Sequence, residues 1–206
     1  MANEISNVEP PALPLAAEEY NRAISDENNN ILRLFFNRLS TTVNTLLDPT
    51  DSGGKFIYFP RAAFYSTADQ SAGSINTGVA VTFNVTSFNV GITLSNNSRI
   101  NVTNSGTYFF NVTLQVENNN SSDTAVTVWQ QKNGSAIAYS ARRFDIIGSD
   151  DDVISLSFAH QLAAGDYIET YWATSNTSLN LHTETASSPH PGIPAAALSV
   201  VFQSNS

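Results

Sequence analysis

The chain contains no cysteine among its 206 residues. Disulfide bonds and thiolate metal sites are therefore excluded, and so is a cysteine nucleophile. A cysteine-free chain rich in Asn, Ser and Thr is more typical of a bacterial or viral exterior than of an animal extracellular module.

Charge is also scarce, and basic charge most of all. Only 13% of the residues are charged, and 18 acidic residues against 9 basic ones give a net charge of -9. Nucleic-acid binding needs a basic surface that neutralises phosphates. The nearest basic cluster is the pair Arg142 and Arg143, so we expect no nucleic-acid partner.

Long hydrophobic runs are absent as well. We expect no insertion into a membrane and, from the first twenty residues, no signal peptide. The sequence therefore predicts synthesis in a cytoplasm, with lysis of the host cell as one route to the exterior.

Motifs of catalysis are missing. The chain has no G-x-S-x-G elbow and no H-E-x-x-H helix, and its three histidines lack metal-ligand spacing.

The run GSDDDV offers Asp150 and Asp152 as weak metal ligands, but the rest of a calcium loop is missing, which favours a solvated acidic turn. We expect no enzyme and no cofactor. A hydrolase that uses an acid such as Asp166 or Glu169 is an alternative that nothing in the sequence favours.

The N-terminal quarter of the chain predicts an arm, a helix and a linker. Proline-rich residues 1–16, with Leu13 and Leu15, predict an extended arm, with a floppy terminus as the open alternative. Residues 17–47 predict a helix that is poor in propensity at Asn28–Asn30, where a break or a kink is an open alternative. Residues 48–55 predict a linker.

The anchoring residues that we expect on the arm and on the apolar stripe of the helix are Leu13, Leu15, Tyr20, Ile24, Ile31, Leu34, Phe35 and Leu39. Arg38 interrupts a heptad, so the sequence does not predict a long coiled coil.

Residues 56–206 have a different texture, in which short alternating runs are separated by polar turns about every ten residues. This pattern predicts a mainly β domain, a jelly-roll sandwich of about ten antiparallel strands. Asn133-Gly134 is a hairpin signal, because both central positions of a type I′ turn need a positive φ. The expected strands are 56–65, 79–84, 87–94, 98–103, 106–117, 124–132, 136–144, 153–160, 166–174, 177–183 and 195–203.

The strand 106–117 has one odd residue. Tyr108, Phe110 and Val112 begin a regular core face, while the opposite face is polar except for Phe109. A lone exposed Phe is commonplace, but a Phe on the outer face of a strand can also mark contact with another subunit.

Through three short sequence motifs, this domain resembles the trimeric jelly rolls of the complement globular-head and tumour-necrosis-factor superfamily. The motifs are G-x-Y-x-F at Gly106, K-N-G at Lys132 and L-x-x-G-D at Leu162, followed by an apolar closing strand, over about residues 56–203. The resemblance implies a homotrimer, in which the face of Phe109, Asn111 and Thr113 points toward the threefold axis.

The front of the chain resembles virion proteins of tailed bacteriophages, notably those of marine bacteria. The marks are Tyr20, Asn30, LRLFFN at 32–37, Phe59-Pro60 and Asp69-Gln70. The resemblance implies a structural protein exposed on a phage particle and anchored to another virion protein through residues 1–47. A capsid decoration or head fibre is favoured over a tail-fibre tip, because the chain has no long shaft.

A second hypothesis is a module that binds a host receptor or a surface glycan. Its candidate loops are 118–123, 145–152 and 185–194. Trp129 and Trp172 lie in predicted strands, so we expect both in the core rather than at such a site.

Overall fold

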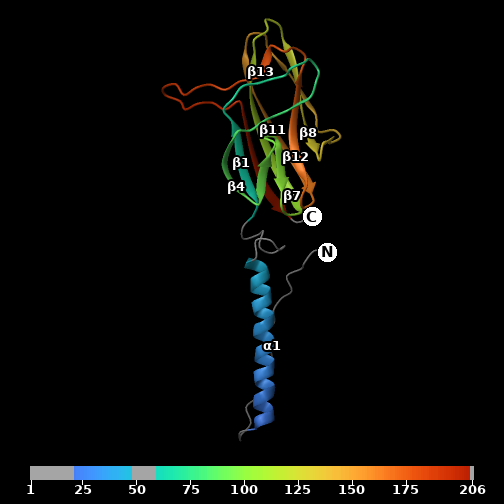
Figure 1. Ribbon diagram of the computed structural model, residues 1–206, viewed down its shortest axis with the longest axis vertical. Helices are drawn as coiled ribbons and strands as arrows, with labels where there is room; N and C mark the ends of the chain where they lie inside the picture. The colour runs from blue at the N-terminus through green and yellow to red at the C-terminus, as the bar shows by residue number, and fades with distance from the viewer. Residues whose placement is uncertain (1–20, 48–58, 205–206) are drawn as a thin grey trace. The chain divides into compact units, whose positions relative to one another are not determined.

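The computed structural model describes residues 21–47 and 59–204. The chain divides into two compact units, residues 1–58 and residues 59–206, and each is described by itself. The first contains helix α1 and the second is a β-sandwich (Figure 1). No helix within the described ranges is long and apolar enough to cross a membrane.

Helix α1 spans Arg22–Leu47 without a break. The side chain of Asn21 caps its first turn, since its Oδ1 accepts hydrogen bonds from the backbone N–H groups of Ala23 at 2.9 Å and Ile24 at 3.4 Å. The helix continues through Asn28–Asn30, so the alternative of a break there is wrong. One local contact at this point is the hydrogen bond from Arg33 to the side chain of Asn30, at 2.9 Å.

The second unit consists of two antiparallel sheets packed face to face, which confirms the jelly-roll sandwich. Sheet A has the order β2-β13-β7-β14-β1-β4, with β11 on the other side of β7. Sheet B has the order β10-β8-β12-β6-β5, with β3 beside β12 and β9 beside β8. The strands are β1 (Arg61–Ser66), β2 (Gln70–Ser71), β3 (Val79–Ala80), β4 (Val85–Val90), β5 (Ile92–Ser95), β6 (Arg99–Val102), β7 (Gly106–Asn118), β8 (Thr124–Lys132), β9 (Ser135–Ala136), β10 (Arg142–Ile146), β11 (Asp151–Leu162), β12 (Tyr167–Thr174), β13 (Leu179–Leu181) and β14 (Ala196–Ser204).

Strand β7 organises sheet A. It pairs with β11 along one side and with β14 and β13 along the other. Its even-numbered residues from Tyr108 to Val116 are fully buried, as the alternation predicts. The phenol of Tyr108 donates a hydrogen bond to the carbonyl of Asn104 at 2.7 Å, and burial raises the pKa of this phenol to about 12.

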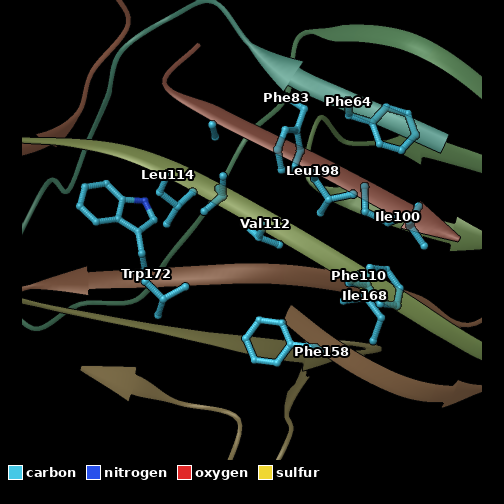
Figure 2. Close-up of a cluster of buried hydrophobic side chains, with 14 of the residues drawn as sticks. Phe64, Phe83, Ile100, Phe110, Val112, Leu114, Phe158, Ile168, Trp172 and Leu198 are labelled. Atoms are coloured by element: carbon cyan, nitrogen blue, oxygen red, sulfur yellow. The ribbon is translucent and has the colours of Figure 1, made fainter. Parts of the chain in front are cut away.

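The core lies between the two sheets. Figure 2 shows Phe110, Val112 and Leu114 of β7 in the same cluster as Ile168 and Trp172 of β12. The side chain of Trp172 is completely buried. Because side chains alternate along each strand, every core residue has a neighbour that points to the outer face of its sheet.

Two predicted strands are each divided into two. Residues 87–94 cross Gly91, whose φ of 63° turns the chain from β4 in sheet A to β5 in sheet B. Residues 136–144 contain a loop between β9 and β10, in which Tyr139 has a φ of 61° and the buried hydroxyl of Ser140 accepts a hydrogen bond from the backbone N–H of Gln130 at 3.1 Å. Alternation in the sequence did not reveal either interruption.

Two of the motifs that suggested the superfamily form one structural unit. Asn133 and Gly134 have positive φ angles of 50° and 80°, which confirms the predicted turn. The carboxylate of Asp166 lies 2.7 Å from the ammonium of Lys132, and it accepts hydrogen bonds from the side chain of Asn133 at 2.7 Å and the backbone of Ala163 at 2.8 Å. The β8–β9 turn is thereby fixed to the start of β12.

Candidate functional site

The outer face of sheet A contains the residues that the sequence singled out. In β7, Phe109, Asn111 and Thr113 all point away from the core. The structure leaves 43% of the surface of Phe109 exposed, while Asn111 is exposed and Thr113 is half-buried. The threefold axis that the resemblance implies remains a prediction, since only one chain is present.

Cross-strand register sets the neighbours of these three residues. Phe109 pairs with Ala159 on β11 and with Val201 on β14, and Val201 pairs in turn with Arg61 on β1. Arg61 pairs with Val90 on β4. Directly opposite side chains in antiparallel strands have Cβ atoms about 5 Å apart. A row of residues therefore crosses the sheet from β11 to β4.

Two further rows run parallel to the first. Asn111 lies between Ser157 and Ser199, and Thr113 lies between Ser155 and Ala197. The row of Asn111 continues through Ala63 on β1 to Phe88 on β4. The row of Thr113 continues through Tyr65 on β1 to Val85 on β4. Among the residues of these three rows, Arg61 alone is charged.

Four exposed apolar side chains lie at one end of this face, and a fifth, Val153 on β11, lies toward the other end. Phe88, Val90, Phe109 and Val201 are exposed over 50%, 36%, 43% and 40% of their surfaces. We call these four residues the apolar patch. The sequence singled out Phe109 only, because the partners of its row come from strands distant in the sequence. The signal that could have found them is the same alternation read on β14 and β4.

A groove lies beside the apolar patch on the same face. It has a volume of about 520 Å³, within the range of pockets that bind ligands. Asn111 and Thr113 form part of its floor. The other lining residues are Ala63, Phe64, Tyr65, Ser87, Gly192, Pro194, Ala197, Leu198 and Ser199. None of these described lining residues is charged, and several are small.

The other end of the face is acidic. His182 lies 3.2 Å from Asp69 and 3.7 Å from Glu117, measured from its Nδ1 to a carboxylate oxygen of each. The pKa of Asp151 is raised, chiefly by burial and then by the nearby charge of Glu117. These residues sit beyond the three rows, in which Arg61 is the one charged residue, so the face has a largely apolar end and an acidic end.

The weak metal ligands do not form a site within the described chain. The carboxylates of Asp150 and Asp152 each accept a hydrogen bond from the next residue's backbone N–H, at 2.9 and 2.7 Å. Across residues 21–47 and 59–204, no group of three or more His, Cys, Asp or Glu side chains could hold a metal ion. Asp150 lies in the turn before β11, and Asp152 is an exposed residue of β11 itself.

Two of the three candidate ligand loops are joined. The side-chain amide of buried Asn118 donates hydrogen bonds to the carbonyls of Ile146 and Ile147, at 3.1 and 3.0 Å. The backbone N–H of Ser149 bonds to the carbonyl of Asn120 at 2.8 Å. Loops 118–123 and 145–152 thus form one end of the sandwich, while 185–194 belongs to a separate hairpin.

The two tryptophans differ in position. Trp172 is buried in the core, as expected. Trp129 is not a core residue: it lies half-buried on the outer face of sheet B, where its ring packs against Tyr171 with ring centroids 5.8 Å apart. The expectation for Trp129 is wrong because it is out of phase with the inward residues Val128 and Gln130.

The expected anchoring residues are only partly described. Leu13, Leu15 and Tyr20 lie outside the described residues. On α1, Leu34 is exposed over 50% of its surface, whereas Ile24, Ile31, Phe35 and Leu39 are half-buried. Phe36, exposed over 59%, and Val43, exposed over 41%, were not among the expected anchors. Helical periodicity places both on the same broad face as Leu39, which is the signal that could have found them.

Comparison with known proteins gives little beyond the fold. No protein-family model matches the chain, and no curated protein matches it. Among solved structures, the crystal structure of murine APRIL at pH 5.0 is similar, with a TM-score of 0.48 and 13% sequence identity over 70% of this chain and 98% of that chain. This likeness concerns the course of the chain and carries no argument about function.

Proposed function

We propose that the protein is a self-associating structural component of a phage virion, a homotrimer whose jelly roll is exposed on the particle. The observation that supports self-association is the apolar patch on the outer face of sheet A. An exposed cluster of large apolar side chains beside a neutral groove is typical of an interface. The work that we propose is assembly, without catalysis.

A closed cyclic oligomer would bury this face on every copy. Strand β11 is an edge of sheet A, and its outer side has no partner strand among the described residues. Cyclic symmetry buries the same patch on every copy and leaves no face free for further growth. Three copies around an axis near Phe109 would cover the patch on all of them.

The virion role rests on the resemblance of the front of the chain to phage proteins. Several of its marks have structural roles here. Gln70 donates to the carbonyl of Thr82 and accepts from the N–H of the same residue, both at 2.8 Å. Asp69 accepts a hydrogen bond from the backbone of Thr183 at 2.8 Å. The LRLFFN run supplies Leu34 and Phe36, the most exposed of the large apolar side chains described on α1.

Self-association is tested by the mass of the purified chain in solution, measured by light scattering or sedimentation. We expect three times 22.2 kDa. Phe109→Asp should weaken association by roughly 30-fold or more, since it places a charge in the centre of the contact. Ile75→Asp is the matched control, because Ile75 is exposed over 55% of its surface in the turn before β3. A wild-type monomer at micromolar concentration would refute the proposal.

The anchoring role of α1 is tested on particles. Leu34→Asp should leave the mass of the assembly unchanged and prevent its incorporation into virions. Asn37→Asp, an exposed polar position on the same helix, is the control. Normal incorporation of the Leu34 variant would contradict anchoring through this face. An image of the particle would show the location: on the order of hundreds of copies favour capsid decoration, and a few tens favour a vertex or tail.

The alternative of a glycan-binding or receptor-binding tip has less support in the structure. Trp172 is buried, and Trp129 lies on the outer face of sheet B rather than at the joined loops 118–123 and 145–152. Selective binding of the intact protein to a glycan array would favour this alternative.

A further inference from the structure

A hairpin arm leaves the sandwich between β13 and β14. Figure 1 shows it as the red loop that projects to one side. Glu184 and Ile193 exchange backbone hydrogen bonds of 2.9 and 3.0 Å at its base, and Ser187 and His190 exchange bonds of 3.1 and 2.7 Å near its tip. We call residues 184–193 the arm.

The base of the arm is fixed to the sandwich. The hydroxyl of Thr183 donates a hydrogen bond to the carbonyl of Ile193 at 2.8 Å, and the backbone N–H of Thr183 bonds to Asp69. Beyond this base, Thr185 to Gly192 are all exposed. A two-stranded hairpin without a packed face is marginally stable in water, so the projecting part needs a covering surface.

The arm and the groove are adjacent on the same face of the molecule. Gly192 and Pro194, at the base of the arm, line the groove on the outer face of sheet A. A copy that covers the apolar patch therefore meets the arm as well. Rotation about a nearby axis brings the arm of each copy to the face of its neighbour.

The two surfaces match in charge and in size. Residues 185–192 include no Lys, Arg, Asp or Glu, and the lining residues of the groove include none either. In a chain with a net charge of -9, contact between two copies avoids mutual repulsion only where both surfaces are neutral. Small side chains such as Ala63, Ala197 and Ser199 leave room in the groove for a thin arm that carries Ala186, Ser187 and Ser188.

We propose that the arm of one copy binds in the groove of a neighbouring copy of this chain and clasps the two subunits together. This inference rests on the proposed self-association, and it names the segment and the groove that make the contact. A foreign partner in the groove would leave each arm without a partner in the assembly.

The cysteine-free chain permits a direct cross-linking test. Ala186→Cys marks the arm, Ser199→Cys marks the groove and Ser135→Cys on β9 in sheet B is the control, and all three positions are exposed. Pairs of single-cysteine variants with tags of different length are mixed, exchanged and treated with a short bismaleimide. We expect the mixed product from arm and groove, and little from arm and control.

The possible outcomes separate the two proposals. A wild-type monomer would refute self-association and the clasp together. If Phe109→Asp dissociates the wild-type assembly while arm and groove do not cross-link, the clasp is wrong and self-association stands. Cross-linking of arm to arm in place of arm to groove would also overturn the clasp.

A second variant does not depend on cysteine chemistry. Ala186→Glu puts a charge at a neutral contact and should weaken association by about tenfold. Thr177→Glu, an exposed position in the turn before β13, should not. Equal affinities for the two variants would count against the clasp.

Discussion

Single residues fix the ends of the strands, and Asp166 shows how. Its carboxylate joins the start of β12 to the β8–β9 turn through Lys132 and Asn133. The hydrogen bond from Lys132, followed by that from Asn133, lowers the pKa of this carboxyl to about 2. The ordinary value is 3.8. The charged form is therefore the one that stabilises the fold.

Asp166→Asn should lower the free energy of unfolding by about 1–2 kcal/mol at neutral pH, because it removes the ion pair and leaves weaker hydrogen bonds. The contribution of the wild-type carboxylate is complete above about pH 4 and disappears as the pH falls through about 2. Urea unfolding across this range measures the effect. Asp145→Asn, which affects an exposed pair with Arg143, is the control and should cost under about 0.5 kcal/mol. An equal cost for both variants would contradict this role.

His160 makes the stability depend on pH in a second range. Its ring lies between Phe158 and Phe110, with centroids 6.0 Å from each, and its Nε2 is buried without a hydrogen-bond partner. Burial, and then the charge of Lys132, lowers the pKa of this imidazole below its ordinary 6.5. The unfolded chain therefore binds a proton at a pH where the folded chain does not.

The free energy of unfolding should accordingly fall as the pH decreases below about 6.5. His160→Phe should remove that slope, and His190→Phe in the exposed arm should leave it in place. Thermal unfolding between pH 7.5 and 5 measures both. A slope that persists in His160→Phe would show that another group is responsible.

At the scale of elements, β3 depends on one glycine. A Cβ on Gly78 would lie 2.8 Å from two ring carbons of Trp129, so the segment before β3 packs directly on this ring. Gly78→Ala should push the segment off sheet B and destabilise the fold by about 1–3 kcal/mol. Gly73→Ala is the control, because nothing lies within 4 Å of the added atom. Tryptophan fluorescence reports the change, and an unperturbed spectrum with unchanged stability would contradict it.

Elements with strict alternation could be predicted from the sequence. Strand β8 spans Thr124–Lys132, with the bounds that its pattern predicts, and β7 differs from its prediction by one residue. The corner at Gly91 could not be predicted, because the apolar pattern continues through it. The groove could not be predicted either, since it combines Ala63, Thr113, Gly192 and Ser199, which only the register of three strands and the arm brings together.

For the whole molecule, the distribution of charge decides how the proposed self-association should respond to salt. Each copy carries a net charge of -9, while the apolar patch, the groove and residues 185–192 are neutral. Salt screens the repulsion between copies, whereas contacts among these neutral residues do not depend on ion pairs. The dissociation constant should therefore decrease between about 50 and 500 mM salt, as sedimentation can show. Weaker association at high salt would mean that ion pairs hold the copies together.

The fold of the whole molecule was easier to predict than its contacts. Turn residues such as Asn133-Gly134 and the alternation in β7 define a sandwich. The partner of an outer face leaves no periodic pattern in the sequence, because such a face needs only to be neutral and moderately apolar. Phe109 was noticed because a large aromatic residue stands among polar neighbours.

The alternation of side chains along β7 limits which sequence changes the strand can accept during evolution. One set of alternate residues builds the core, and the other set meets whatever covers sheet A. Insertion of a single residue would exchange the two sets along the rest of the strand, so lineages should show substitutions here and few insertions or deletions. Odd-numbered positions such as 109, 111 and 113 are free to vary without disturbing the interior. With the proposed self-association through this face, related chains can therefore acquire subunits that no longer mix, while the jelly roll beneath stays the same.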